Sequence, residues 1–415
     1  MRNTLTFKHT KLACFFTTLV MSAAFCLPSL LFATFNEIYG ISYTLLGSLV
    51  VVCFFTQLGI DLIFSFFGRF FNIHKTIRLM PILTALGLVL YATIPTLFPQ
   101  YAYVGLAIGT FVFSIAAGLS EVLLSPMIAA LPSDNPERDM SMLHSLYGYG
   151  VVSVVLISTV FLKIAGTENW MYLTYFLALL PVVASVFLMI TPMPEMKLDN
   201  GKETSEKSGY RRKTLVLCIL CIVLGSCTEN TMTSWISVYV EKALTIPKVY
   251  GDIFGMCLFA GLLALTRTVY AKYGKNIFRV LKISMLCSVL LYVIVAVSKN
   301  PIVSLLACAC LGVCTAMLWP GTLILMEEKI PGVGVTAYAL MAAGGDTGAS
   351  VAPQLLGIVV DNVAISEWAK NLANSMALSP EQIGFKVGML TAAIFPLLGL
   401  LLMVYMKKHF DKNKS

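Results

Sequence analysis

Twelve long apolar segments, separated by short polar breaks, constrain the fold of this chain more than any other feature. They lie at about residues 12–35, 43–67, 79–98, 102–131, 140–162, 170–191, 214–240, 249–271, 279–298, 301–326, 335–360 and 385–406. A helix needs about 20 mostly apolar residues to cross a bilayer, whereas transmembrane β-strands are about ten residues long and alternate in polarity. The sequence therefore predicts an all-α membrane protein with twelve transmembrane helices.

The composition supports this prediction and excludes the water-soluble classes. Of the 415 residues, 58% are apolar and 12% are charged, whereas soluble domains carry about 25% charged residues. Disordered and disulfide-stapled chains have far fewer large apolar residues. The eleven cysteines all lie in apolar segments, so we expect no extracellular disulfide. Cys218 and Cys221 form a CxxC inside a span, where we expect apolar packing rather than a metal or redox role.

The distribution of Lys and Arg predicts the orientation, because loops rich in these residues stay in the cytoplasm. With both termini inside, the outer face holds only a few of the 29 basic residues: Lys163, Lys242, Lys248, Lys299, Lys370 and Lys386. The net charge of +8 is then a consequence of topology and does not indicate nucleic-acid binding. We expect a multi-pass protein of the cell membrane, with both termini cytoplasmic and the first segment retained as a span.

The longest cytoplasmic break divides the chain into two halves of six spans each. Residues 192–213 are rich in charge and contain two prolines and two glycines, which is typical of a linker. The predicted bundles are residues 1–191 and 214–415. Several residues recur between them: Glu37 and Gly47 as Glu241 and Gly251, and Gly118, Pro126 and Gly150 as Gly312, Pro320 and Gly344. Parallel six-helix repeats are typical of one large class of secondary transporters.

Polar residues inside the spans mark a candidate transport pathway, because an ionisable group at the bilayer centre costs about 2.5–3.5 kcal/mol and normally faces a partner or a cavity. In three spans, polar residues recur every three or four positions along one helical face, with a small residue at one position in two of the spans. They are Ser114, Gly118, Glu121 and Ser125; Ser226, Asn230, Thr233 and Ser237; and Ala343, Thr347, Ser350 and Gln354. Helix packing is the alternative explanation for the Ser and Thr positions.

Four titratable residues are candidates for proton coupling. Glu121 is the first, because a carboxylate in a poorly hydrated cavity can be protonated on one side of the membrane and deprotonated on the other. A permanent ion pair or a hydrogen bond to substrate are its alternatives. His144 titrates near neutrality, although a lone interfacial His also serves in packing. Glu229 and Asp346 lie beside the polar faces of their spans and are coupling or cation-binding candidates, unless hydrogen bonds neutralise them.

Other residues are candidates for substrate binding and gating. Polar and aromatic side chains of the second half suit contacts with a solute, with packing as the alternative for the aromatics: Asn230, Thr233, Trp235, Trp319, Thr347 and Gln354. Asp61, Arg69 and Arg267 are candidates for a gate, although Arg69 and Arg267 also fit interfacial anchors. We predict no metal site, cofactor or catalytic residue.

Twelve spans, a charged middle linker and basic-glycine turns after spans 2 and 8 resemble the major facilitator superfamily. Within it, span 4 is similar to the fucose, galactose and glucose proton symporter family, whose segment reads G-x-x-x-E-x-x-x-x-P. Ala117 replaces the glycine here, whereas Glu121 and Pro126 keep the E-x4-P spacing. The resemblance implies that Glu121 carries the coupling proton.

Span 5 resembles the same family over residues 143–150, LHSLYGYG, with His144 and Tyr147 where amides are usual. By this resemblance, Ser125 of span 4 and Tyr147 of span 5 contact the substrate. Residues 151–155 lack the proline that typifies antiporters, which favours symport.

We therefore predict a secondary active transporter that moves a small solute, such as a sugar or related metabolite, by proton-coupled symport. A proton-coupled efflux antiporter for drugs or metabolites is the alternative. A multispanning enzyme or sensor is disfavoured, because the longest outer loop, at about residues 361–382, carries few acids. No G-x4-G-K-[ST] element indicates ATP hydrolysis. The expected partners are the solute, protons and the lipid bilayer, and the expected state is a monomer.

Overall fold

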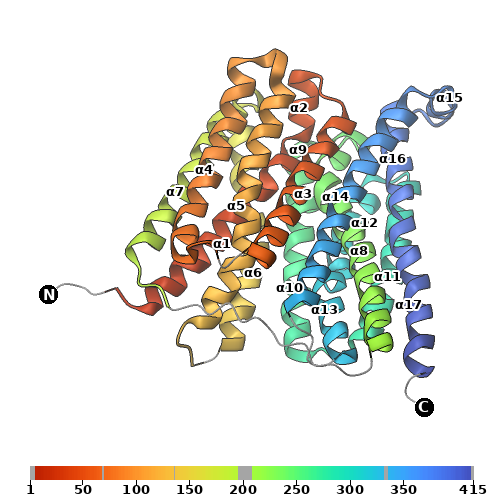
Figure 1. Ribbon diagram of the computed structural model, residues 1–415. Helices are drawn as coiled ribbons and strands as arrows, with labels where there is room; N and C mark the ends of the chain where they lie inside the picture. The colour runs from red at the N-terminus through yellow and green to blue at the C-terminus, as the bar shows by residue number, and fades with distance from the viewer. Residues whose placement is uncertain (1–4, 68–69, 135, 195–207, 331–334, 413–415) are drawn as a thin grey trace. The chain divides into compact units, whose positions relative to one another are not determined.

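The computed structural model describes residues 5–67, 70–134, 136–194, 208–330 and 335–412. All secondary structure in these residues is helical (Figure 1). Twelve of its segments are long and apolar enough to cross a membrane. The predicted fold class is confirmed.

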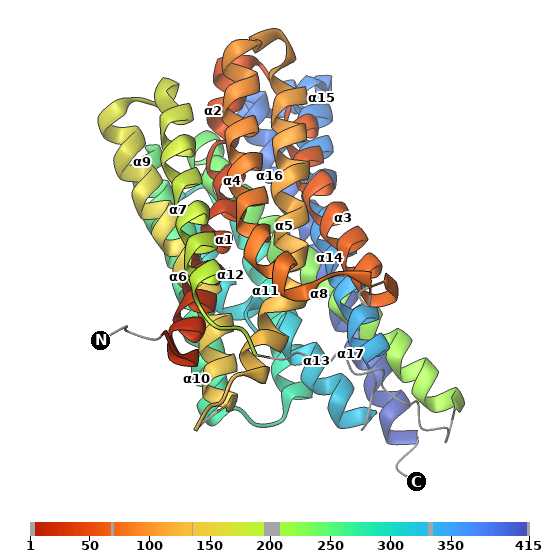
Figure 2. The same cartoon turned by 60° about the vertical axis from the view of Figure 1, so that its left-hand side comes forward.

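The described residues contain seventeen α-helices, most of which lie in these spans. Those before the central linker are α1 (Phe7–Leu30), α2 (Phe32–Tyr39), α3 (Tyr43–Phe67), α4 (Ile73–Leu97), α5 (Ala102–Ala130), α6 (Pro136–Ala165) and α7 (Trp170–Ile190). Those after it are α8 (Ser208–Val238), α9 (Lys248–Gly251), α10 (Leu258–Tyr273), α11 (Ile277–Val297), α12 (Pro301–Thr315), α13 (Leu318–Lys329), α14 (Val335–Ile365), α15 (Glu367–Met376), α16 (Pro380–Ala392) and α17 (Ile394–Lys412). Helices α4 and α5 pack against each other, and Figure 2 shows them side by side.

The first span differs from the predicted 12–35. Its helix, α1, begins at Phe7 and ends at Leu30, and α2 follows after a break at Leu31. Leu31 has φ −103° and ψ 0°, and its N–H donates to the Pro28 carbonyl, three residues back. Pro28 has no N–H to continue the regular helical pattern, and such i→i−3 bonds are common where helices end.

Two further segments also differ from the prediction. The segment 361–382, which was predicted to be an outer loop, contains a helix, α15, whose N-cap Ser366 accepts a hydrogen bond from the Ala369 N–H. The tenth span is divided at Ala316 and Met317, between α12 and α13. Pro320 lies in the first turn of α13, where proline is tolerated because its missing N–H has no helical partner there.

The chain packs as two units, one with residues 1–41 and 52–199 and the other with residues 42–51 and 200–415. The start of α3 thus belongs to the second unit. Asp361 of α14 accepts the backbone N–H groups of Tyr43 and Thr44 at 3.3 and 2.6 Å. The Tyr43 hydroxyl donates to Glu381 at 2.5 Å. Most of the predicted linker, residues 195–207, lies outside the described residues, so its boundaries stay a prediction.

Two of the three recurring glycine pairs make recurring contacts, whereas Gly47 and Gly251 meet different neighbours. In the first unit, Gly118 of α5 lies against α3, and Gly150 of α6 lies against α1. In the second unit, Gly312 of α12 lies against α10, and Gly344 of α14 lies against α8. Gly118 and Gly312 both join the fourth span of their half to its second span, and Gly150 and Gly344 both join the fifth span to the first. The recurrence in the sequence therefore corresponds to a repeated packing pattern.

Replacing Gly312 with Ala is expected to destabilise the protein. A Cβ at this position would lie 2.2 Å from the Phe259 carbonyl oxygen, so α10 and α12 would have to separate. Overpacking of this kind costs about 1–3 kcal/mol. Thermal unfolding in one detergent measures the effect, with Gly261→Ala as the control, because a Cβ on Gly261 meets nothing within 4 Å. Equal melting temperatures for the two variants would contradict this packing.

Cysteines contribute to the apolar cores, as predicted. All eleven are free. Cys218 and Cys221 are fully buried in the core of the second unit, among side chains that include Ile277 and Met326. The CxxC therefore acts there as a pair of small apolar residues.

Candidate functional site

Two polar helix faces meet in the first unit. Polar or small residues recur about every four positions on both helices: Cys53, Gln57 and Asp61 on α3, and Ser114, Gly118 and Glu121 on α5. The Ser114 hydroxyl donates to the Cys53 sulfur at 3.0 Å. A Cβ on Gly118 would lie 3.1 Å from the Gln57 Cα, so the two backbones approach closely. This packing brings the next acids along the two faces, Asp61 and Glu121, near each other.

Asp61 and Glu121 form a pair of carboxylates without a cation among the described residues. Asp61 is 6% exposed, and neither of its carboxylate oxygens has a hydrogen-bond partner among the residues that the structure describes. Glu121 is exposed although it lies within α5, and it has no hydrogen bond or ion pair with any described residue. The two lie close enough for their charges to interact. Two neighbouring carboxylates repel when both are ionised, and a proton on either removes the repulsion.

The other first-half candidates lie on the next turn of α5, on α6 or outside the described part. Ser125 is partly exposed on α5, about one turn beyond Glu121. Tyr147 of α6 forms a hydrogen bond with the Cys26 thiol of α1. His144 lies in α6, but its side chain is outside the described part of the structure. Arg69 lies wholly outside that part. Their predicted roles in coupling and gating stay predictions.

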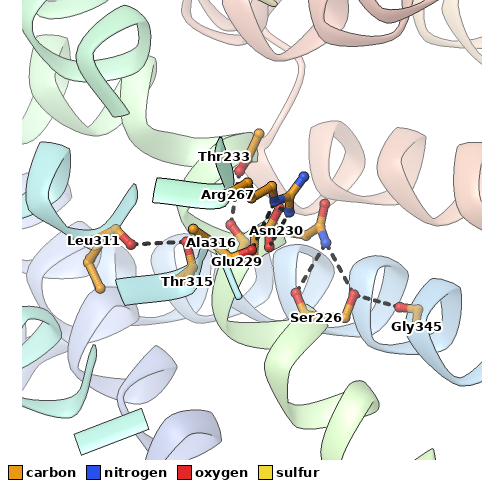
Figure 3. A network of polar contacts seen from close by, with 9 residues as sticks. All are labelled: Ser226, Glu229, Asn230, Thr233, Arg267, Leu311, Thr315, Ala316 and Gly345. Carbon is orange, nitrogen blue, oxygen red and sulfur yellow. Dashed lines mark hydrogen bonds and ion pairs between the residues drawn. The ribbon is translucent and has the colours of Figure 1, made fainter. Parts of the chain in front are cut away.

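An ion pair joins α8 to α10 in the second half (Figure 3). Nη2 of Arg267 donates to Oε1 and Oε2 of Glu229 at 3.1 and 3.3 Å. Nε of Arg267 donates to the Ala316 carbonyl at 2.8 Å. That carbonyl lies in the break between α12 and α13, and the residue four positions on, Pro320, has no N–H to donate to it. The structure thus joins Glu229, a coupling candidate, to Arg267, a gating candidate.

The polar face of α8 continues on both sides of this pair (Figure 3). The Ser226 hydroxyl donates to the Gly345 carbonyl of α14 at 2.6 Å, which is a helix-packing contact. Asn230 donates to the Ser226 hydroxyl at 3.1 Å, and the Thr233 hydroxyl donates to the Glu229 carbonyl at 3.0 Å. Asn230 and Thr233 remain partly exposed, so both can also contact a solute.

The two tryptophan candidates are held by packing. Trp235 is fully buried, and its Nε1 donates to the Pro353 carbonyl at 2.9 Å. Its ring packs against Tyr43 and Phe385. Trp319 is partly buried and lies over Gly345. Packing explains Trp235 in this conformation, and a solute contact by either residue stays a prediction.

The candidates on α14 differ in exposure. Asp346 is 2% exposed. Thr347 is partly exposed, and its hydroxyl donates to the Ala343 carbonyl at 2.7 Å. Gln354 is partly exposed overall, whereas its side-chain oxygen is buried and has no hydrogen-bond partner. Thr347 and Gln354 therefore remain open to a solute, whereas Asp346 is sealed from one here.

Sequence reasoning missed Cys53, Gln57 and the Ala316 carbonyl. Cys53 and Gln57 precede Asp61 by two turns and one turn, so their helical spacing was a usable signal. Pro320 was the available signal for the Ala316 carbonyl, because a proline has no N–H to bond the carbonyl four residues before it. Within the described chain, no group of three or more His, Cys, Asp or Glu side chains could hold a metal ion.

Comparisons with known proteins agree with this architecture. The family profile described as Major Facilitator Superfamily matches residues 13–353. A search of curated protein sequences finds no match. Among solved structures, a bacterial homolog of the human lysosomal transporter Spinster, in an inward-facing and unoccupied conformation, has 11% identity and a TM-score of 0.76, covering 99% of this chain and 98% of its own.

Other solved structures share the same fold. A D-xylose–proton symporter has 15% identity and a TM-score of 0.72, with 94% of this chain and 96% of that chain covered. The nucleoside transporter NupG has 12% identity and a TM-score of 0.69, with 94% and 98% covered. At these identities the structures share the fold alone.

Proposed function

Since this chain belongs to the major facilitator superfamily and is therefore a secondary transporter, we propose that it carries a small polar solute together with a proton. We further propose that it works in the cell membrane, as a monomer with both termini in the cytoplasm.

The observation that carries this proposal is the contrast between two acids inside the spans. Glu229 is paired with Arg267 at 3.1 Å, so its charge is compensated. Glu121 has no cation among the described residues and lies near a second carboxylate, Asp61. An uncompensated carboxylate inside a membrane is most stable in its protonated form when it is not hydrated. Glu121 is thus suited to bind a proton in one conformation and to release it in another.

The protonated carboxyl also explains how coupling would work. A neutral Glu121 removes the repulsion from Asp61 and lowers the cost of closing the site against water. An ionised Glu121 opposes that closure. Protonation therefore favours the occluded state that moves the solute, and release of the proton on the far side completes the cycle.

A sugar or related hydroxylated metabolite is the solute class that we propose. The E-x4-P spacing of Glu121 and Pro126 supports it through the resemblance to hexose and fucose proton symporters. The partly exposed side chains of Asn230, Thr233 and Thr347 offer hydrogen-bonding groups for hydroxyls.

Ligand screening followed by uptake tests the proposal. Thermal-shift screening of the purified protein against sugars and metabolites identifies a ligand, and proteoliposomes with an alkaline interior then measure its uptake. We expect accumulation that a protonophore abolishes and that does not require sodium. Accumulation that ignores both pH and sodium gradients would show that transport is not coupled. Uptake driven only by an acidic interior would indicate antiport.

A further inference from the structure

We infer that Arg267 recognises an anionic group on the transported solute, and that Glu229 is the internal counter-ion which this group displaces. The inference rests on the proposed function, because it assigns the chemical class of the solute. It concerns the second unit alone, where the two residues lie on α10 and α8.

The guanidinium of Arg267 uses only part of its hydrogen-bonding capacity. Nε donates to the Ala316 carbonyl, and Nη2 donates to Glu229. Nη1 has no partner among the described residues, and Figure 3 shows one guanidinium nitrogen without a dashed contact. The Arg267 side chain is 28% exposed, so a solute can reach it. The Nη1–Nη2 end of a guanidinium is the fork that binds carboxylates and phosphates with two parallel hydrogen bonds.

The bond to Ala316 fixes this fork in place. Because Nε is held at 2.8 Å by a backbone carbonyl, the guanidinium plane keeps its orientation when the contact with Glu229 is lost. A preorganised donor pair loses less side-chain entropy on binding than a free arginine does. The break between α12 and α13 thus has a function, since it frees the carbonyl that orients Arg267.

Charge balance makes Glu229 a competitor of the solute. Glu229 is the only acid in an ion pair with Arg267 among the described residues. One guanidinium compensates one negative charge, so a bound anion and the Glu229 carboxylate oppose each other. A neutral sugar gains little from such a site, because its hydroxyls are weaker acceptors than a carboxylate.

The neighbouring side chains favour a hydroxylated anion. Asn230 and Thr233 are partly exposed on α8, next to and one turn beyond Glu229. Their oxygen atoms can accept hydrogen bonds from solute hydroxyls. A small solute with one carboxylate or phosphate and several hydroxyls, such as a sugar acid or a sugar phosphate, matches these groups.

Calorimetric binding to the purified protein tests this assignment with matched solutes. The probes are D-glucose against D-glucuronate and glucose 6-phosphate, and glycerol against glycerate and glycerol 3-phosphate. For wild type, we expect at least one anion to bind tenfold or more tightly than its neutral partner. Arg267→Gln should weaken this binding at least tenfold, and Arg267→Lys should weaken it less. Glu229→Gln should strengthen it severalfold, because the competing charge is gone.

A purely structural ion pair would give a different pattern. In that case Arg267→Gln and Glu229→Gln would both weaken binding, because each leaves an unpaired charge. The double variant Arg267→Gln/Glu229→Gln leaves no unpaired charge and should melt near wild type while failing to bind the anion. Arg279→Gln, at an exposed position, controls for the loss of a positive charge. Equal losses from the two single variants, or no anion bound in preference to its neutral partner, would overturn the inference.

Uptake measurements separate this inference from the proposed function. If a neutral solute accumulates with the pH gradient and no anion binds, the inference fails and proton symport stands. If an anion binds through Arg267 but its accumulation ignores the pH gradient, the assignment of Arg267 stands and proton symport fails.

Discussion

Replacing Glu121 with Gln is expected to abolish pH-driven accumulation while leaving solute counterflow intact. Gln is nearly isosteric with a protonated Glu and remains neutral at every pH, so the solute can still cross but no proton travels with it. A one-to-one symporter gains about tenfold in accumulation for each unit of pH gradient. In the variant, the ratio of internal to external solute should fall to about one.

Proteoliposome uptake under an imposed pH gradient measures this effect, and counterflow at equal pH shows whether binding and exchange survive. Glu328→Gln is the matched control, because Glu328 is an exposed carboxylate at the end of α13. Normal uphill uptake by Glu121→Gln would rule out Glu121 as the proton carrier. If counterflow is lost as well, Glu121 binds the solute rather than the proton alone.

The number of spans could be predicted because it depends on a local quantity, the length of each apolar segment. The end of the first helix at Leu30 could not, because apolar segments run on through the break at Leu31. The length of an apolar segment does not show where a helix breaks when the residues on both sides of the break are apolar. Pro28 and Pro320 lie within a few residues of the two unpredicted breaks. Proline alone does not predict a break, because Pro126 and Pro353 lie inside unbroken helices.

Pairings across helices were harder to predict than faces along one helix. The face of α5 that carries Glu121 follows from helical spacing alone. The ion pair between Glu229 and Arg267 joins residues on α8 and α10, so it depends on which helices pack together. Periodicity gives no information on that choice. Trp235 shows the converse limit, because an aromatic residue suited to a solute is fully buried by its neighbours.

Replacing Asp61 with Asn is expected to shift the pH dependence of uptake toward acid. The Asp61 carboxylate is buried without a hydrogen-bond partner and interacts with the charge on Glu121. Two ionised carboxylates repel each other, so the pair binds a proton more readily than one carboxylate alone does. Asn keeps the shape and removes one charge, so uptake then needs a lower pH.

Coulomb's law gives the order of magnitude of the shift. Two unit charges about 10 Å apart at an effective dielectric of about 20 interact by about 1.7 kcal/mol. This energy corresponds to a shift of about one pH unit in half-maximal uptake. Initial uptake rates in proteoliposomes between pH 5 and 9 measure it, with Asp134→Asn as a control at an exposed carboxylate in the same unit.

The Asp61 variant also tells the two carboxylates apart. An acid shift with pH-driven accumulation retained places the proton on Glu121, with Asp61 as the charge that adjusts its affinity. Complete loss of pH-driven accumulation in Asp61→Asn, together with normal accumulation in Glu121→Gln, would place the proton on Asp61 instead. An unchanged profile would mean that Asp61 is itself protonated throughout the cycle, because only an ionised Asp61 repels Glu121.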